Sequence, residues 1–407
     1  MALQSGLAIV ISLIAVIGMV FRPQRSQEWM WAAGAALLLL LLRILSPGQA
    51  LAAVLRGDDV YAFLIGIMAL AELARHEGLF DWLATHALDA GHGSQHRLFA
   101  LVYLVGALVT ALLSNDTTAV VLTPAISAAL ARTDASPLPY LFGCAFIANA
   151  ASFVLPISNP ANLVVFGPHL PALHVWLAAF GLSALSALAC TYVGLRFFFR
   201  VKLRSPYDIS AQPRSLPPAV ALSGVAIALA AIALIVAAAL RIDVGITALV
   251  AAIGCLAIVS LRERSAALFV ARHLAWQIVP LVAGLFVIVA ALDRAGVLDV
   301  LRNLFQHGAP LVVAFAIAVA SNLFNNLPVA LATGFALQSA PVTPAVAHAA
   351  LVAVDLGPNV AVTGSLATML WLIALRRDGF NVSAWHFFRI GVAITIPALI
   401  LSVFLVR

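Results

Sequence analysis

Inside the long apolar run of residues 107–122 stands a polar stretch, Ser114-Asn115-Asp116-Thr117-Thr118. An acid and four small polar side chains are costly in hydrocarbon, so within a membrane they usually serve a function. A second polar break, Asn325-Asn326-Leu327-Pro328, follows in the second half of the chain. We interpret the two breaks as halves of one binding site near the middle of a membrane.

The composition identifies the medium in which this chain folds. Of its 407 residues, 64% are hydrophobic and only 9% are charged, whereas soluble domains carry about 25% charged residues. The apolar stretches approach the roughly 20 residues that an α-helix needs to cross a bilayer. We therefore expect an integral membrane protein surrounded by lipid. No basic run is interleaved with aromatic residues, so we expect no nucleic-acid partner.

The three cysteines predict neither a zinc site nor a disulfide framework. Cys144, Cys190 and Cys255 are far apart, and each lies in an apolar segment without a CxxC or His/Cys cluster. We expect no cofactor, and no metal beyond a transported metalloid. Cys144 could approach the break near Asn149, although a buried structural cysteine is the commoner case. The first apolar stretch has no basic region before it, so we expect a retained helix rather than a signal peptide.

The hydropathy pattern divides the chain into two similar halves. Residues 1–199 predict three helices, a centrally broken segment, a helix with a polar interruption and a closing helix. These lie at about 6–21, 28–45, 59–75, 97–131, 138–166 and 175–199. A linker rich in proline and charge, 200–217, follows. Residues 218–407 repeat the plan at about 218–240, 245–261, 275–292, 309–338, 344–375 and 386–406.

This repetition predicts an all-α polytopic membrane protein built from two inverted repeats, a mark of secondary transporters. Each repeat would have about five transmembrane helices and one re-entrant helical hairpin. We prefer hairpins at 97–131 and 309–338 because each arm is about 15 residues, short for a full span of roughly 20. Two full crossings per segment are the alternative. The histidine-containing stretch 76–96 is expected to be a solvated loop.

The positive charges predict the orientation. With five full crossings per half, most of the 22 Lys and Arg residues fall on one side, which marks that side as cytoplasmic. The loops on that side lie near 22–27, 75–97, 132, 196–214, 262–272 and 376–389. We expect a plasma-membrane protein, in a bacterium the inner membrane, with its basic loops in the cytoplasm.

Helices broken inside a membrane expose backbone groups, which are tolerated only within protein or beside a wet cavity. Their ends offer free N–H donors and C=O acceptors. Four such breaks meeting near the centre would form a cage for a small, oxygen-rich solute. The candidates to bind it are Asn115, Thr117, Thr118, Ser158, Asn159, Asn162, Asn325, Asn326, Thr363 and Ser365. No Lys or Arg lies inside any break, so a clamp for a strongly anionic solute is not expected.

Two acids, Asp116 and Asp355, accompany the breaks, one in each half. A carboxyl group in a medium of low dielectric constant can shuttle protons, and we expect both to couple transport to protons. The alternative for Asp116 is that it caps the second helix of its hairpin.

The motifs around these residues resemble the ArsB-type arsenite and antimonite permeases of the ion transporter superfamily. The resemblance runs nearly end to end in one order. It rests on the motifs at 113–124, 146–152, 155–164, 325–328 and 355–372.

The resemblance implies export of arsenite and antimonite from the cytoplasm by proton antiport with alternating access. It also implies a possible cytosolic ATPase subunit, and by analogy a homodimer formed through the opening helices. The site residues that it implies are Asn115, Asp116, Thr117, Ser158, Asn159, Asn325, Asn326 and Ser365. Arsenite at neutral pH is mostly the uncharged trihydroxide, which suits a site with donors and acceptors but no cation.

Two positions depart from the pattern of the relatives. Asn149-Ala150 stands where we expect an acid and a hydroxyl, and Asn359 stands where relatives often carry a lysine. A cation beside Asp355 would then be missing.

Other functions remain open. A sodium/proton antiporter or another small-ion permease of the same superfamily is the first alternative, and sodium dependence of transport would identify it. An intramembrane enzyme using Asp116 and Asp355 as a dyad lacks the expected Gly-x-Gly-Asp context, so we do not predict an enzyme. The chain has no phosphate-binding G-x-x-x-x-G-K-[ST] motif, so any ATP use would need a separate subunit.

Overall fold

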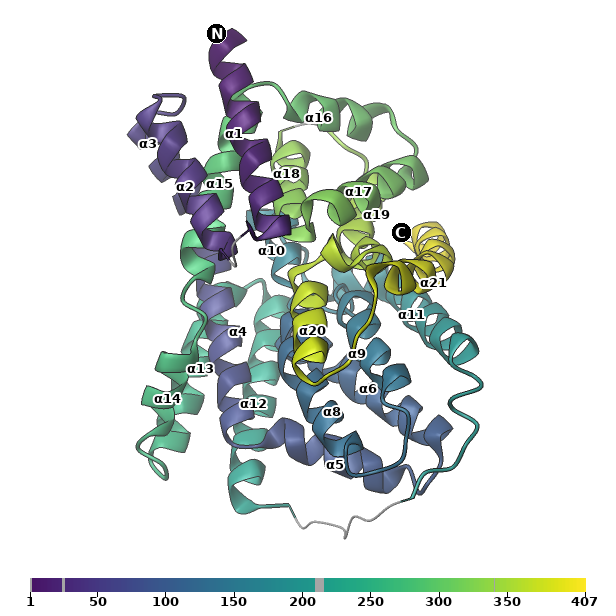
Figure 1. Ribbon diagram of the computed structural model, residues 1–407. Coiled ribbons are helices and arrows are strands. Elements are labelled where there is room, and N and C mark those ends of the chain that lie inside the picture. Colours follow the sequence, from purple (N-terminus) through teal and green to yellow (C-terminus); the bar gives the residue numbers. More distant parts are fainter. Residues whose placement is uncertain (1, 24–25, 209–215, 340) are drawn as a thin grey trace.

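The computed structural model in Figure 1 describes residues 2–23, 26–208, 216–339 and 341–407. Within these ranges the chain forms helices, turns and loops, and no β-strand. The middle of the predicted linker 200–217 lies outside the described residues. The predicted all-helical architecture is therefore confirmed for the described part of the chain.

Helices of the first half follow the hydropathy pattern, with short elements added between them. In order they are α1 (Ala2–Phe21), α2 (Glu28–Leu41), α3 (Pro47–Leu55), α4 (Asp58–His76), α5 (Leu79–Ala90), α6 (Gln95–Leu113), α7 (Asn115–Thr117), a π-helical turn (Thr118–Leu122), α8 (Thr123–Leu130), α9 (Leu138–Ala150), α10 (Pro160–Phe166) and α11 (Leu173–Phe198).

Helices of the second half repeat this order. They are α12 (Pro218–Leu240), α13 (Val244–Ser260), α14 (Ala266–His273), α15 (Ile278–Arg294), α16 (Leu298–His307), α17 (Pro310–Phe324), α18 (Asn326–Gln338), α19 (Pro344–Leu356), two 3₁₀ turns (Gly357–Val360 and Val362–Gly364), α20 (Leu366–Arg377) and α21 (Ala384–Leu405).

The predicted loop between residues 75 and 97 is wrong, because α5 occupies most of it. Phe80, Ala84, Ala87 and Leu88 recur at helical spacing and are buried, so an amphipathic helix covers the ends of its neighbours. The hydropathy pattern missed it because its other face is polar. The hydropathy pattern missed α16 for the same reason, because Leu298 and Phe305 are buried on an otherwise polar helix. In Figure 1, α5 lies at the lower end of the view and α16 at the upper end.

Local capping explains several helix starts. The Ser94 hydroxyl accepts from the N–H of Arg97 at the start of α6, and Asp243 accepts from Ile246 at the start of α13. Ser46 and Gln49 form a reciprocal capping box at α3. A side-chain oxygen at the first position satisfies a backbone donor that the helix itself cannot pair.

The helices of the two halves interleave. α4 packs along α13, and α2 packs along α15, so each long pair takes one helix from each half. α11 packs along α21, where the Ser183 hydroxyl donates to the carbonyl of Ser402 over 2.8 Å. Figure 1 shows α1–α3 beside α15–α18 in its upper part, and α4, α5 and α8 near α12–α14 in its lower part.

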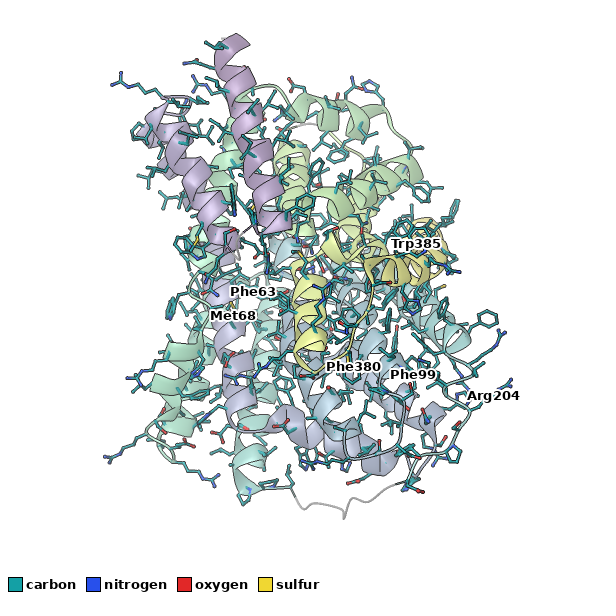
Figure 2. The ribbon with its side chains drawn as sticks, viewed as in Figure 1. Phe63, Met68, Phe99, Arg204, Phe380 and Trp385 are labelled. Carbon is teal, nitrogen blue, oxygen red and sulfur yellow. The ribbon has the colours of Figure 1, made fainter. Side chains whose placement is uncertain are left out.

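The side chains are distributed as in a protein that lies in lipid. Phe63 and Phe99 are buried between helices, whereas Trp385 stands at the outer surface with 66% of its area exposed (Figure 2). Within the described residues, six helical segments are long and apolar enough to cross a membrane, one of them made of α14, α15 and the turn between them. They are Leu3–Phe21, Gln95–Leu113, Leu173–Phe198, Pro218–Leu240, Ala266–Arg294 and Ala384–Leu405. The chain is thus an integral membrane protein.

Two findings bear on the predicted topology. Helix α6 has 19 residues, more than the arm length on which our preference for a hairpin rested, so length alone does not separate a hairpin from a crossing.

Loops that we predicted on one side meet in pairs: the N–H of Tyr207 donates to Gly93 over 2.9 Å, and His76 contacts Glu263. The loop after α1 is an exception, because Glu28 borders the second break instead.

Candidate transport site

Both hairpins turn at a residue with the same unusual backbone. Ser114 ends α6 with φ 82° and ψ 158°, and Asn325 ends α17 with φ 73° and ψ 149°. Positive φ is uncommon for residues other than glycine. In each case an asparagine follows, Asn115 or Asn326, and begins the second arm. The two breaks named from the sequence thus share one backbone conformation.

Replacing Ser114 tests this geometry. We expect Ser114→Val to lower stability by about 1–3 kcal/mol, because a β-branched residue resists positive φ. Ser114→Gly should be at least as stable as the natural chain. Thermal unfolding of detergent-purified protein measures the difference. Equal melting temperatures for the Val and Gly variants would show that the turn is not constrained.

The threonines of the first break hold the hairpin together rather than pointing into a cage. The Thr117 hydroxyl donates to the Leu113 carbonyl over 2.6 Å, and the Thr118 hydroxyl lies 2.8 Å from that of Thr110. The π-helical turn follows directly. Just after it, Pro124 in α8 has no N–H to continue the ladder of backbone hydrogen bonds.

At this break the side-chain hydrogen bond to a backbone N–H comes from Asn115 and not from Asp116. The Asn115 Oδ1 accepts from the backbone N–H of Asp116 over 2.9 Å. Asn115 is buried, while Asp116 is half-buried, and within the described residues its carboxylate accepts no hydrogen bond. Helix α7, which carries Asp116, packs against α9 and α20. Asp116 therefore has no structural partner that accounts for an acid at this place.

The break between α9 and α10 is tied to the first hairpin. The Ser158 hydroxyl donates to the carbonyl of Ala111 over 3.1 Å and accepts from the N–H of Leu155 over 3.0 Å. Asn162 donates to the carbonyl of Ser152 over 2.9 Å, so both side chains fold this irregular segment.

The break between α19 and α20 is tied to the second hairpin in a comparable way. The Asn322 Oδ1 accepts from the N–H of Ala361 over 2.7 Å, and the Thr363 hydroxyl donates to the Asn322 carbonyl over 2.8 Å. Ser365 caps α20 by accepting from the N–H of Thr368. Thr363 is thus a structural residue in this conformation.

Hydrogen bonds between the two halves cross at the centre of the molecule. The Asn159 Nδ2 donates to Asp355 Oδ1 over 2.7 Å. In return, the Asn149 Nδ2 donates to Asn359 Oδ1 over 2.9 Å and to the Thr368 hydroxyl over 3.3 Å. We call these the crossed contacts.

The crossed contacts occupy matching positions in the two halves. Asn149 is the twelfth of the 13 residues of α9, and Asp355 is the twelfth of the 13 residues of α19. Each reaches the first turn of the broken helix in the other half, which starts after Asn159 or Ser365. Asp355 and Asn149 are fully buried. Neither Asn149, Asn359 nor Thr368 was among the predicted site residues, although the sequence shows Asn149 and Asn359 at two unusual positions.

Three buried oxygens, two of them in the crossed contacts, have no hydrogen-bond partner among the described residues. They are Asp355 Oδ2, Asn149 Oδ1 and Asn162 Oδ1. An unpaired buried acceptor costs about 1–3 kcal/mol, and more when it is charged. Native structures usually pair such atoms. A proton, a water molecule or a solute that carries O–H groups would satisfy these oxygens.

The second break borders a small cavity. Its volume of about 30 Å³ is close to the share of one water molecule in the liquid, and Asn325 and Glu28 line it. The Asn325 Oδ1 accepts from the N–H of Leu327, and Asn326 is buried beside it. Arg22 forms an ion pair with Glu28. Folding thus brings a cation near this break, although none lies within it in the sequence.

The known proteins to which the chain is similar indicate a membrane transporter. The sequence pattern of the citrate transporter family (CitMHS) matches residues 9–357, so the chain belongs to this family. It is 28% identical over 97% of both chains to the arsenical pump membrane protein of Escherichia coli K12. It is 29% identical over 84% of both chains to the protein of that name from Yersinia enterocolitica.

A solved structure has a similar fold. The YdaH transporter of Alcanivorax borkumensis superposes with a TM-score of 0.55, covering 89% of each chain at 14% identity. At this identity the likeness concerns the fold alone. The predicted resemblance to arsenical permeases is confirmed at the level of these relatives.

Proposed function

We propose that this protein exports arsenite, and also antimonite, from the cytoplasm in exchange for protons. One observation carries the proposal: the buried contact between Asn159 and Asp355, which leaves Asp355 Oδ2 unpaired. A neutral trihydroxide offers O–H donors to such oxygens and needs no cation clamp. The names of the two bacterial relatives support the metalloid as the substrate.

The coupling proton would use Asp355 and Asp116. Asp355 is fully buried and has one free oxygen, and Asp116 is half-buried at the tip of the first hairpin. An acid within a membrane protein that faces other polar groups is suited to a proton relay. Asn115, Ser158, Asn326 and Ser365 would surround the solute. In this conformation Thr117, Thr118, Asn162 and Thr363 would support the site through the hydrogen bonds described above.

Alternating access would follow from two inverted repeats, 1–199 and 218–407, that rock about the crossed contacts. The matched positions of Asn149 and Asp355 support such a repeat, with re-entrant hairpins at 97–131 and 309–338. The basic loops would face the cytoplasm of a bacterial inner membrane. A cytosolic ATPase subunit would bind near the basic loop 200–214, and two copies would pair through their opening helices.

The family's description favours a second candidate, an organic anion such as citrate. Against it, the crossed contacts consist of amides, hydroxyls and one acid, and a multiply charged anion would meet Asp355 without a neighbouring cation. Arg22 near the second break is already paired with Glu28. The first experiment therefore compares both substrates, and sodium as the coupling ion.

Everted membrane vesicles energised by a proton gradient test the proposal. We expect arsenite uptake by the natural chain, its collapse with an uncoupler, and its loss in Asp116→Asn. The matched control is Asp378→Asn, because Asp378 is exposed at the end of α20, and it should transport normally. The proposal would be rejected if the vesicles take up citrate but not arsenite, or if their transport depends on sodium and does not carry arsenite. Either result would indicate another ion permease.

A further inference from the structure

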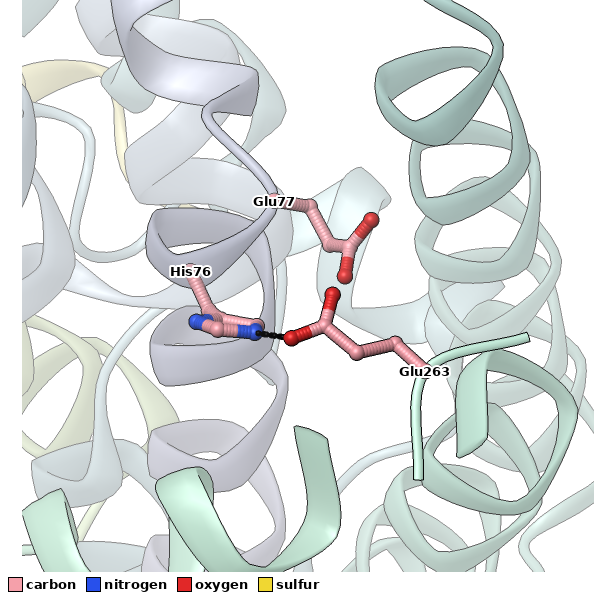
Figure 3. A group of neighbouring side chains, drawn as sticks. All are labelled: His76, Glu77 and Glu263. Carbon is pink, nitrogen blue, oxygen red and sulfur yellow. Dashed lines mark hydrogen bonds and ion pairs between the residues drawn. The ribbon is translucent and has the colours of Figure 1, made fainter. Parts of the chain in front are cut away.

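A cluster of ligand-type side chains lies away from the transport site, where the two halves meet at the end of α4. His76 is the last residue of α4, Glu77 follows it, and Glu263 belongs to the turn between α13 and α14. The His76 Nε2 lies 3.0 Å from a carboxylate oxygen of Glu263. One nitrogen or oxygen atom from each of the three residues falls within 4.8 Å of the others. Figure 3 shows the two carboxylates turned toward each other beside the imidazole.

The two carboxylates have Arg262 as a cationic neighbour, and a bound cation would satisfy the atoms that remain unpaired. Two carboxylates approach each other, and like charges at this separation repel. The Oε1 atom of Glu77 is shielded from solvent and has no hydrogen-bond partner among the described residues. A carboxylate oxygen that is shielded from solvent and unpaired is costly, and a metal ion would satisfy it.

Neighbouring residues hold the ligand atoms in place. The His76 ring stacks on Phe269 with 4.2 Å between centroids, and Phe269 stacks in turn on His273. The Ser265 hydroxyl donates to Glu263 over 2.8 Å. Such supporting contacts orient metal ligands in advance and are usual around metal sites.

We propose that His76, Glu77 and Glu263 bind a divalent cation of the Zn²⁺ class, which fastens α4 of the first half to the α13–α14 turn of the second. One imidazole nitrogen and two carboxylate oxygens suit Zn²⁺, whereas Mg²⁺ and Ca²⁺ prefer oxygen ligands alone. Ligand atoms at about 2.1 Å from a tetrahedral ion lie about 3.4 Å apart. The cluster reaches this spacing by small side-chain movements, with the His76–Glu263 hydrogen bond replaced by two metal bonds and water in the fourth position.

The site is separate from transport of the metalloid. It consists of charged side chains at helix ends, whereas the crossed contacts are buried amides and hydroxyls. Its proposed effect is on the cohesion of the two halves, because α4 and α13 form one of the long pairs between them.

Zinc binding to the full-length protein tests this inference. The detergent-purified protein is treated with a chelator, dialysed and titrated with Zn²⁺, and binding is followed by calorimetry and by the melting temperature. We expect one ion per chain at this site and a rise in melting temperature with Zn²⁺, since a ligand of the folded state stabilises it. Glu77→Gln and His76→Gln should each weaken binding at least about tenfold.

Matched controls separate a metal site from general stability. Glu72→Gln and His86→Gln change the same residue types nearby, in α4 and α5, and should bind Zn²⁺ as the natural chain does. Without metal, Glu77→Gln should melt no lower than the natural chain, because it removes one of two facing charges. The inference is overturned if the natural chain shows no zinc-dependent shift, if both ligand variants bind like it, or if Mg²⁺ produces the same effect.

Discussion

Replacing Asp355 by asparagine should abolish proton-driven accumulation while leaving the fold intact. The variant keeps an acceptor at Oδ1 for the Asn159 Nδ2, which lies 2.7 Å away, but it loses the group that can take up a proton at the unpaired Oδ2. One charge moving through 100 mV carries about 2.3 kcal/mol, which corresponds to an accumulation ratio of about 50 for each exchanged proton. In vesicles held at 100 mV, we expect that ratio to fall to about 1.

Downhill movement of arsenite separates coupling from structure in this experiment. Asp355→Asn should still let arsenite equilibrate across vesicles without a gradient, because the amides and hydroxyls of the crossed contacts remain. Asp355→Leu is the comparison, since it leaves the Asn159 Nδ2 without its acceptor and should lose both activities, at about 1–3 kcal/mol in stability. Full accumulation by Asp355→Asn would assign Asp355 a structural role only.

The crossed contacts also explain how the chain can lack the acid and the lysine that its resemblance to the arsenical permeases led us to expect at two positions. Asn149 and Asn359 stand at those two positions, and their side chains bond to each other over 2.9 Å. The Asn359 Nδ2 donates in turn to the carbonyl of Phe146 over 2.9 Å. Two amides thus stand in place of an acid and a lysine, so these two positions carry no buried charge. Asp355 is the acid that remains at the crossing.

Hydropathy predicted the long helices well because a membrane leaves few alternatives to an apolar helix. It failed for α5 and α16, whose apolar faces are narrow and whose polar faces resemble loops. The two breaks were located correctly, since polar residues in an apolar run are visible without a structure. The inverted relation of the halves and the depth of the hairpins stay predictions.

Roles within the site were harder to predict than its location. A hydroxyl in a break looks like a ligand, yet those of Thr117 and Thr118 bond within their own hairpin. Which partner a short polar side chain chooses depends on the local backbone, and the positive φ at Ser114 has no signature in the sequence. The contact between Asn159 and Asp355 joins residues far apart in the chain, so neither composition nor spacing could reveal it.

The contact between α4 and α13 should be the most sensitive to an added methyl group. A Cβ atom at Gly245 would lie 2.2 Å from the carbonyl oxygen of Asp59, and one at Gly66 would lie 2.4 Å from the backbone of Ala248. Small residues let membrane helices approach this closely, and backbone cannot move aside as a side chain can. We expect Gly245→Ala to cost about 1–3 kcal/mol or more, with lower expression and a lower melting temperature.

Gly254 provides the matched control, because it lies in the same helix and an added Cβ would meet no atom within 4 Å. Gly254→Ala should therefore behave like the natural chain or gain slightly from higher helix propensity. The corresponding pair α2–α15 allows the same test with Gly284→Ala, whose Cβ would lie 2.5 Å from Ala32, against Gly34→Ala, which has free space. Similar losses of stability in the Gly245 and Gly284 variants, with none in the Gly254 and Gly34 variants, would show that both long helix pairs, α4–α13 and α2–α15, hold the two halves together. Equal stability of Gly245→Ala and Gly254→Ala would mean that α4 and α13 pack less closely than described. The proposed metal ion would then have no closely packed helix pair to fasten.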